Sequence, residues 1–382
     1  MTLAKAFIPY GAWWSSPFCR WQGSLAGENS VQLAARATQA FLADRGIATE
    51  TFDGLALGFT VPQKHSFYGA PWLAGMIGAG HVTGPTIMQA CATGARVVAT
   101  LAMEVETGAG ACRLGVACDR TSNGPHLVYP DPRGIGGMGD TEEWVWDNFN
   151  RDPYAGNAML QTAENVAKAH GITTEEQHEI VLLRHGQYDR ALADDRAFQR
   201  RYMLPMQVGN PKKPTTVEQD EGVFPTTAEG LARLRPVVDG GTVTFGGQTH
   251  PADGNAGIVV CTEERARELS RDPAVRIQVL GFGSARVDKG HMPTAVVPAA
   301  LAAMKAAGVG LGSVEGDQDH NPFAVNDAYH FCKTRPPERL NDYGSPLICT
   351  PRARPGCVLI ELMEQLALEG RRLRLFSGLR RR

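Results

Sequence analysis

The chain has 382 residues, of which 43% are hydrophobic and 20% charged, and its formal net charge is −2. This near-neutral balance argues against a general nucleic-acid binder and against a protein of anionic membrane surfaces. The length exceeds what one compact core normally reaches, so we expect two core domains or two fused halves.

The N-terminal residues MTLAKAFIPYGAWW contain too few apolar residues before Pro9 and Gly11 for a signal peptide. No run of about 18 apolar residues occurs, so we expect no transmembrane helix. The eight cysteines include no CxxC pair, and no set of cysteines and histidines has the spacing of zinc ligands. We therefore expect reduced cysteines, a cytoplasmic protein and no bound metal.

Taken in chain order, the first third alternates helices and strands. An amphipathic helix from Asn29 to Gly46 precedes a buried strand, FDGLALGFTV. A β-rich segment, HVTGPTI, leads into an apolar pattern at helical spacing from Val97 to Val105, and CRLGVACD at 112–119 is a further strand. This order implies a parallel sheet covered by helices.

The next region, 120–245, is rich in loops and includes two helices, the second capped by Thr173 with Glu176 three residues later. A strand at GIVVCT, a helix at ERARELS, a strong strand over 275–283 and a helix near 293–307 then repeat the earlier order. We infer an internal structural duplication. The expected units are an N-terminal half, a loop domain and a C-terminal half, with the boundaries 1–119, 120–245 and 246–382.

Cys91 lies in the turn between the HVTGPTI segment and the helix, in MQACATGARVV. A cysteine at this place is near the free N–H groups and the positive end of the helix dipole, which favour the nucleophilic thiolate. Gly94 would let another backbone or a substrate approach closely. The alternative is that Cys91, between two alanines, is a small buried hydrophobic residue.

Four segments in the same order resemble the thiolase superfamily. They are QACATGARVV, in which Thr93 stands where serine is usual, TAENVAKAHGITTEEQHE, VDGGTVTFGGQTHPADGNAGIVV, and DHNPFAVND, which is similar to the HDCF box of sterol-carrier-protein-type thiolases. The phrases FIPYGAWWSSPFCRWQG and SFYGAPWL are similar to benzoylsuccinyl-CoA thiolase subunits. The four segments occur in order across more than 200 residues, from Gln89 to Asp327.

The resemblance implies a five-layer αβαβα fold made of two duplicated halves with an inserted loop domain. It implies reversible cleavage or formation of a 3-oxoacyl-CoA, with coenzyme A as co-substrate and no covalently bound cofactor. It also implies a homodimer or homotetramer. In this branch a zinc-ribbon/OB-type partner subunit is a further possibility. No nucleic acid and no membrane are implied.

By the resemblance, Cys91 accepts the acyl group and His320 helps to bind the thioester oxygen in an oxyanion hole. Without that context, a histidine in HNPF is more often a loop-capping or core residue. His185 and Thr249 lie in segments that the resemblance associates with coenzyme A. His185 can equally be a solvated residue at a helix end.

Two positions depart from the family pattern. Pro351 stands where a histidine that activates the nucleophile is expected, and Leu379 stands where a second cysteine acts as acid and base. A final core strand normally follows in the family. Either short frame shifts or true divergence would produce CTPRARPGC and the LRRR terminus. The alternative to an active acyltransferase is a catalytically impaired homologue that binds acyl-CoA or serves as a scaffold subunit.

Overall fold

The computed structural model describes residues 2–333, 340–347, 355–370 and 373–377. Within them, one large mixed sheet has the strand order β12-β1-β11-β6-β4-β5, with β2 and β3 also paired to β11. β11 runs antiparallel to both β6 and β1, whereas β6, β4 and β5 are parallel. The strands of this sheet are β1 (Phe7–Pro9), β2 (Trp13–Ser15), β3 (Cys19–Arg20), β4 (Gly54–Gly58), β5 (Thr86–Ile87), β6 (Cys112–Asp119), β11 (Ala252–Cys261) and β12 (Arg276–Gln278).

Helices cover both faces of the large sheet, because its strands alternate apolar side chains between the two faces. α1 (Ser30–Arg45), α2 (Gly69–Met76) and α8 (Glu263–Leu269) pack on one face, and α3 (Thr93–Thr107) and α11 (Pro355–Glu369) lie on the other. Leu55 and Leu57 of β4 join the first core cluster, and Ala56 between them joins the second.

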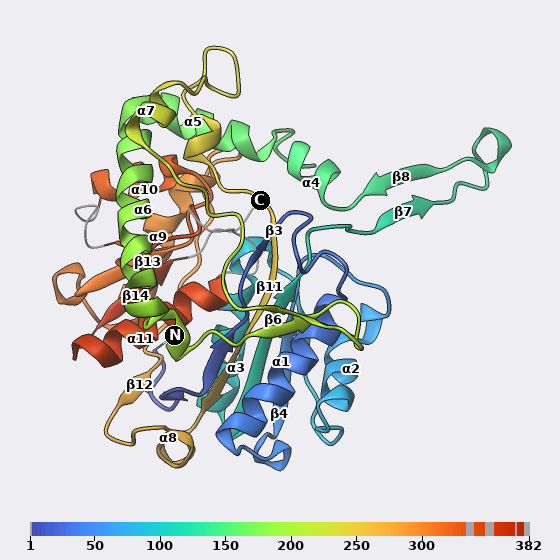
Figure 1. The fold of residues 1–382 in the computed structure, drawn as a ribbon, viewed down its shortest axis with the longest axis vertical. Helices are drawn as coiled ribbons and strands as arrows, with labels where there is room; N and C mark the ends of the chain where they lie inside the picture. Colours follow the sequence, from blue (N-terminus) through green and yellow to red (C-terminus); the bar gives the residue numbers. More distant parts are fainter. Residues whose placement is uncertain (1, 334–339, 348–354, 371–372, 378–382) are drawn as a thin grey trace.

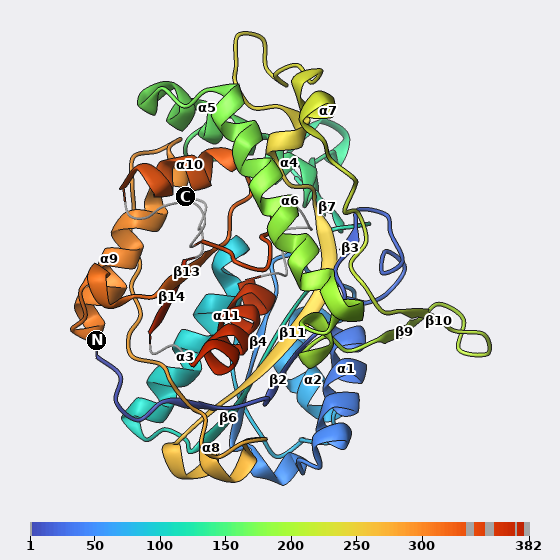
Figure 2. The same ribbon diagram turned by 60° about the vertical axis from the view of Figure 1, so that its left-hand side comes forward.

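A second, smaller sheet pairs β13 (Gly316–Asp319) with β14 (Arg374–Ser377) in parallel. α11 packs between this sheet and α3, and α9 (Val296–Ala307) with α10 (Ala324–Lys333) lies on its outer side. Figure 2 shows the resulting succession of helix, strand, helix, strand and helix across the molecule. The predicted five-layer αβαβα arrangement is therefore observed.

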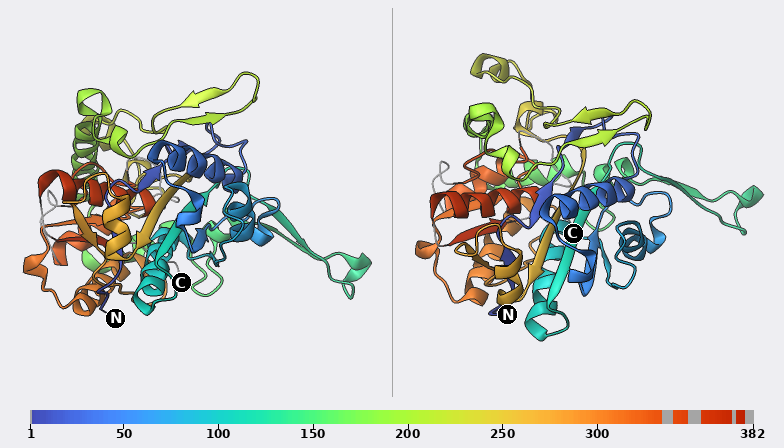
Figure 3. Two further views of the ribbon diagram at one scale, coloured as in Figure 1. Left: turned by 90° about the horizontal axis from the view of Figure 1, so that it is seen from below. Right: turned by 60° about the horizontal axis from the view of Figure 1, so that its bottom comes forward.

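The elements between β6 and β11 form two hairpins and a helical segment. The β7–β8 hairpin extends far from the body, and the β9–β10 hairpin extends on another side (Figures 1 and 3). The boundaries at 119/120 and 245/246 stay predictions, although the strand expected to open the second half, β11, lies in the sheet of the first. These elements are β7 (His126–Tyr129), β8 (Asp140–Glu143), α4 (Trp146–Asn150), α5 (Met159–His170), α6 (Thr174–Arg196), β9 (Met206–Val208), β10 (Thr215–Val217) and α7 (Ala228–Ala232).

The helix ends that the sequence predicts from capping residues are observed in α1 and α6. The Asn29 side chain accepts from two backbone N–H groups at the start of α1, and Gly46 ends this helix with φ 61°. Thr173 and Glu176 form the predicted capping box. Within the described ranges, no helix is long and apolar enough to cross a membrane.

The strand predicted over 275–283 is much shorter than expected. Regular pairing covers only β12, which bonds to β1 on one side. From Val279 to Gly283 the chain runs close to α9. A Cβ at Gly283 would lie only 2.3 Å from the main-chain nitrogen of Ala303. Only Ile277 of this segment is buried, and the described residues hold no second neighbour for the strand.

Candidate active site

The Cys91 turn joins β5 to α3 through a single helical turn at Ala90–Ala92. Ala90 has φ 47°, a left-handed conformation that non-glycine residues adopt only under local constraint. This sharp turn sets Cys91 two residues before Thr93, the first residue of α3, with 6% of its surface exposed. The position matches the helix N-terminus that the sequence predicted.

Threonines hold the turn in place. The Thr93 hydroxyl donates to the Ala90 carbonyl (2.7 Å) and accepts from the Gln89 N–H (2.9 Å). The Thr60 hydroxyl lies 3.3 Å from the same carbonyl. Thr93, where the family usually has serine, therefore supplies the hydroxyl that fixes the conformation around Cys91.

Gly58, the last residue of β4, allows α3 to approach the sheet. A Cβ at Gly58 would lie 2.6 Å from the Thr93 methyl group and 2.8 Å from a Val97 methyl group. Any larger residue would push the start of α3, and Cys91 with it, away from the strand. Gly94 is buried in the first turn of α3.

The position of Cys91 differs from that of the cysteines inside the sheet. Burial raises the pKa of the Cys118 and Cys19 thiols, and a hydrogen bond with Cys112 together with burial raises that of Cys261. Those thiols are held neutral and are poor nucleophiles. Cys91 instead lies at the positive end of a 15-residue helix with no acidic residue in its first turn.

His320 lies directly after β13, fully buried. Its main-chain N–H donates to the carbonyl of Ser377, the last residue of β14 (2.9 Å). The next residues form a tight connection to α10, in which the Asn326 side chain accepts from the Phe323 N–H (3.2 Å). His320 therefore lies where the two strands of the small sheet end.

The segment that contains Thr249 lies against the HNPF residues. The Thr249 N–H donates to the Pro322 carbonyl (2.9 Å), and its hydroxyl donates to the Pro346 carbonyl (2.8 Å). Thr249 is thus brought next to His320. His185 is not: it lies in the interior of α6, where burial lowers its pKa, so the prediction of a helix-end residue was wrong.

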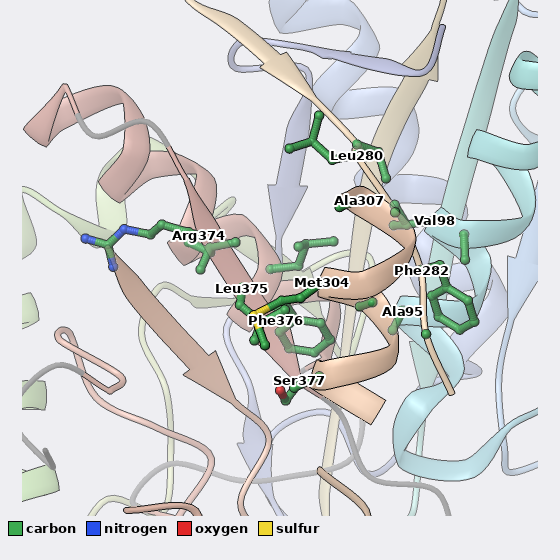
Figure 4. A pocket seen from close by; sticks show the side chains of 18 of the residues that line it. Ala95, Val98, Leu280, Phe282, Met304, Ala307, Arg374, Leu375, Phe376 and Ser377 are labelled. Atoms are coloured by element: carbon green, nitrogen blue, oxygen red, sulfur yellow. The ribbon is translucent and has the colours of Figure 1, made fainter. Parts of the chain in front are cut away.

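One cavity of about 920 Å³ (Figure 4) lies near the two predicted residues, but neither Cys91 nor His320 is among the residues that line it. Gln89 and Ala92, on either side of Ala90 and Cys91, line one end of it. Ser377, whose carbonyl holds the His320 N–H, lines another part. The two halves of the chain therefore contribute neighbouring walls.

The sequence analysis missed a group of buried charged side chains beside His320. Arg184 of α6, fully buried, donates to Asp327 (2.8 Å) and to the Leu340 carbonyl (2.6 Å). Burial, with the charges of Asp327 and Asp317 adding to it, raises the pKa of the Asp319 carboxyl well above its usual range. The sequence GDQD looks like a surface turn, so only the regular apolar elements around it could have indicated burial.

Pro351 and Leu379, the two departures from the family pattern, lie outside the described residues. Within the described residues, no group of three or more His, Cys, Asp or Glu side chains is arranged to hold a metal ion. The groups that remain for chemistry are the Cys91 thiol at a helix N-terminus and the buried polar residues at the ends of the small sheet.

Comparison with known proteins gives a consistent assignment. The thiolase N-terminal domain family matches residues 14–264. The chain is 30% identical to an acetyl-CoA acetyltransferase of Escherichia coli over 314 residues, 79% of this chain and 77% of the relative. A probable acetyl-CoA acyltransferase of Staphylococcus aureus is 27% identical over 94% of this chain and 92% of its own length.

Solved structures agree on the fold. The chain superposes on human mitochondrial 3-ketoacyl-CoA thiolase with a TM-score of 0.88 and 23% identity, over 98% of both chains. Bacillus anthracis acetyl-CoA acetyltransferase gives the same TM-score and identity over 99% of this chain and 96% of its own. The thiolase fold is thereby confirmed. With its family match, its relatives and its two-sheet architecture, the chain belongs to the thiolase superfamily.

Proposed function

We propose that the protein is an acyl-CoA C-acyltransferase that cleaves or forms a 3-oxoacyl-CoA through an acyl-enzyme on Cys91. The observation that carries this proposal is the Cys91 turn, which holds a thiol at the N-terminus of a long helix. The helix end favours the thiolate, which is the attacking species in such a reaction.

In the cleavage direction, the Cys91 thiolate attacks the 3-carbonyl carbon and a sulfur–carbon bond forms. The bond between carbons 2 and 3 then breaks, and its electron pair leaves as the enolate of an acetyl-CoA unit, which takes up a proton. Coenzyme A thiol next gives up its proton, which balances the one taken up by the enolate, and its sulfur attacks the acyl carbon. The bond between that carbon and the Cys91 sulfur breaks, so the shortened acyl-CoA and the Cys91 thiolate are released. No other cofactor is required, and coenzyme A acts as co-substrate.

His320 is proposed to help bind the thioester oxygen of the enolate. Its burial beside the Thr249 segment supports this role, because a donor in a site without water stabilises a developing oxyanion more strongly. Thr249 and the loop region 120–245 are proposed to receive coenzyme A. His185 is set aside because it is partly buried within α6.

We propose a homodimer or homotetramer, and the β7–β8 hairpin supports this proposal. Its tip exposes 98% of Ile135 and 79% of Met138, which is unusual for apolar side chains on an isolated protein. A zinc-ribbon/OB-type partner subunit, a cytoplasmic location and the sterol-carrier-protein-type or benzoylsuccinyl-CoA branch rest on the sequence resemblance alone.

The second candidate function is a catalytically impaired homologue that binds acyl-CoA or serves as a scaffold subunit. It is favoured by Pro351 and Leu379 at the two positions where the family has catalytic residues. Loss of an acid or base group typically slows a reaction by about 10²–10⁴-fold. Binding of acyl-CoA without turnover would distinguish this candidate.

The deciding experiment is mass spectrometry of the intact protein and its peptides after incubation with acetyl-CoA, acetoacetyl-CoA and longer 3-oxoacyl-CoA esters. We expect an acyl adduct on the peptide that contains Cys91, absent from Cys91→Ala. Cys112→Ala is the matched control, since Cys112 is buried in β6, and it should keep the adduct. A folded protein that forms no adduct but binds acyl-CoA would favour the second candidate.

A further inference from the structure

Cys112 and Cys261 lie directly opposite each other in the large sheet. Cys112 is the first residue of β6 and Cys261 is the last residue of β11, and the antiparallel register of the two strands pairs them. Both side chains belong to the first core cluster, so they point to the same face of the sheet. Both are free thiols in this structure, with at most 1% of their surface exposed.

The hydrogen bonds around this pair show that it is a non-hydrogen-bonded pair, the kind in which side chains approach most closely. The main chain of Cys112 bonds away from β11, because its C=O accepts from the Asp53 N–H (3.0 Å) and its N–H donates to the Asp53 carboxylate (3.2 Å). The next residues make the bond between the strands, since the Thr262 N–H donates to the Ala111 carbonyl (2.9 Å). In such pairs the Cα atoms are about 4.5 Å apart.

This separation fits a disulfide bond, in which the Cα atoms are usually about 4.4–6.8 Å apart. A hydrogen bond between the two thiols, together with burial, raises the pKa of Cys261, so the two sulfur atoms are already adjacent. The other cysteines of the sheet face polar residues instead, Cys118 facing Asn255 and Cys19 facing Asp253. Within the described strands, only one position therefore pairs a cysteine with a cysteine.

We propose that Cys112 and Cys261 form an intramolecular disulfide when the protein meets a peroxide. The Cys112 thiol loses its proton and its sulfur attacks one oxygen of hydrogen peroxide, so the O–O bond breaks, a sulfenic acid forms, and the leaving hydroxide takes up that proton as water. The Cys261 sulfur then attacks the sulfenic sulfur and displaces its hydroxyl group, which leaves with the Cys261 proton as a second water. The two thiols lose two electrons, and the peroxide gains them.

The place of the pair in the sheet decides what this bond would do. β11 joins β6 to β1, and a disulfide between strands far apart in sequence strongly restricts the unfolded chain, so the bond should stabilise the fold. Cys91 lies elsewhere, because Gly58, which lies against the start of α3, pairs with Ala117 near the other end of β6. The pair is also next to the exposed Ala111, which gives a small oxidant a short path to the thiols.

The test treats the reduced, folded protein with hydrogen peroxide, removes the excess with catalase, and blocks the remaining thiols with N-ethylmaleimide after denaturation. Peptide mass spectrometry should show Cys112 and Cys261 in one linked species that lacks two hydrogen atoms. Cys118, buried in the same strand, should instead carry the blocking group. The melting temperature should rise by about 5 °C, and dithiothreitol should reverse both the link and the rise.

Three variants locate the effect. Cys261→Ala should give neither the linked peptide nor the rise, whereas Cys118→Ala, which also removes a buried thiol of the large sheet, should keep both. Cys91→Ala should keep both as well, so the outcome is independent of the proposed acyltransferase activity, which requires Cys91. If Cys261→Ala does not fold, the comparison of the oxidised and reduced unmodified protein still decides the outcome.

Two results would overturn the proposal. The first is a folded protein in which Cys112 and Cys261 stay unlinked after peroxide treatment or become linked to other cysteines. The second is a linked pair that leaves the melting temperature unchanged or lowers it, because the bond would then strain the sheet rather than stabilise it.

Discussion

The two halves of this chain place similar helices around two different sheets. In the first half, β11 is ten residues long, buried throughout, and joins β6 to β1. In the second half, the corresponding space is a cavity, and the strand beside it is regular over only three residues. The helices on either side occupy comparable places in both halves. The packing of the helices therefore maintains the layers, whereas the number of neighbouring strands determines how long each strand stays regular.

The strands that correspond in the two halves also differ in chemistry. β4 has the apolar sequence GLALG, and β13 has GDQD, although every residue of both is buried. The first needs only apolar neighbours, whereas the second needs partners for its polar groups. The described residues supply some of these partners: the Asn341 side chain accepts from the Asp319 N–H (2.9 Å), and a His330 ring nitrogen lies 3.8 Å from the Asp317 carboxylate.

The largest effect on stability is expected from disrupting β11 in the first half of the molecule. Gly257→Val places a Cβ 1.9 Å from the Trp14 ring, in the middle of β11. We expect a loss of more than about 4 kcal/mol in the free energy of unfolding, which thermal and urea denaturation would report. Gly75→Ala is the control, because a Cβ at Gly75 meets nothing within 4 Å and the residue lies within α2. A folded Gly257→Val of normal stability would contradict this account.

The halves also differ at the start of their inner helices, since α3 begins after Cys91 and α11 begins at Pro355. Iodoacetamide should modify Cys91 at least about tenfold faster than Cys118, because burial raises the pKa of the Cys118 thiol. Timed alkylation with peptide mass spectrometry measures both rates. Equal rates, or faster modification of Cys118, would argue against an activated Cys91.

A smaller effect follows from the polar strand of the second half. Burial and the charges of Asp327 and Asp317 raise the pKa of Asp319, so the folded state favours its neutral form. As the pH rises above the ordinary carboxyl value of about 4, the unfolded state releases this proton more readily and the folded state loses stability. Asp319→Asn removes this cost. It should raise the melting temperature at pH 7 by about 2 °C or more, with the gain vanishing near pH 4.

The control for this series is Asp140→Asn, whose carboxylate is exposed on β8. It should show no pH-dependent gain. Melting curves of both variants at several pH values test the difference. A gain for Asp319→Asn that is independent of pH would point to packing rather than to ionisation.

The smallest effect is expected from filling the cavity of about 920 Å³. Ala299→Leu adds apolar atoms to a cavity wall and should stabilise the fold by about 1 kcal/mol, in contrast to the disruption expected at Gly257. Ala302→Leu, whose side chain does not line the cavity, should give no gain. Urea denaturation of the two variants measures the difference. A similar loss of stability in both would show that the wall is already closely packed.

Sequence patterns predicted the regular elements well wherever the local signal and the burial agree. The strand 112–119 coincides with β6, and α1 begins and ends at its predicted caps. The strand over 275–283 was predicted too long, because an apolar pattern contains no information about whether a second strand lies beside it. The boundaries of the loop domain at 119/120 and 245/246 remain predictions.

For the candidate site, the sequence located Cys91 at the start of a helix and His320 in a connecting turn. It could not show the left-handed Ala90 or the close approach at Gly58, because both depend on how the sheet and α3 meet. It also could not show that Thr249 lies against the HNPF segment, since that contact joins segments distant in the chain. His185 lies in the interior of α6, which continues to Arg196, and not at a helix end.

The position of β11 also has a consequence for synthesis on the ribosome. Phe7 of β1 pairs with Cys261 at the end of β11, so the large sheet cannot close until about two-thirds of the chain has been made. Until then, Trp13 and Trp14 lack the strand against which they are later buried. Nascent chains released before residue 261 should therefore bind chaperones more strongly than longer ones.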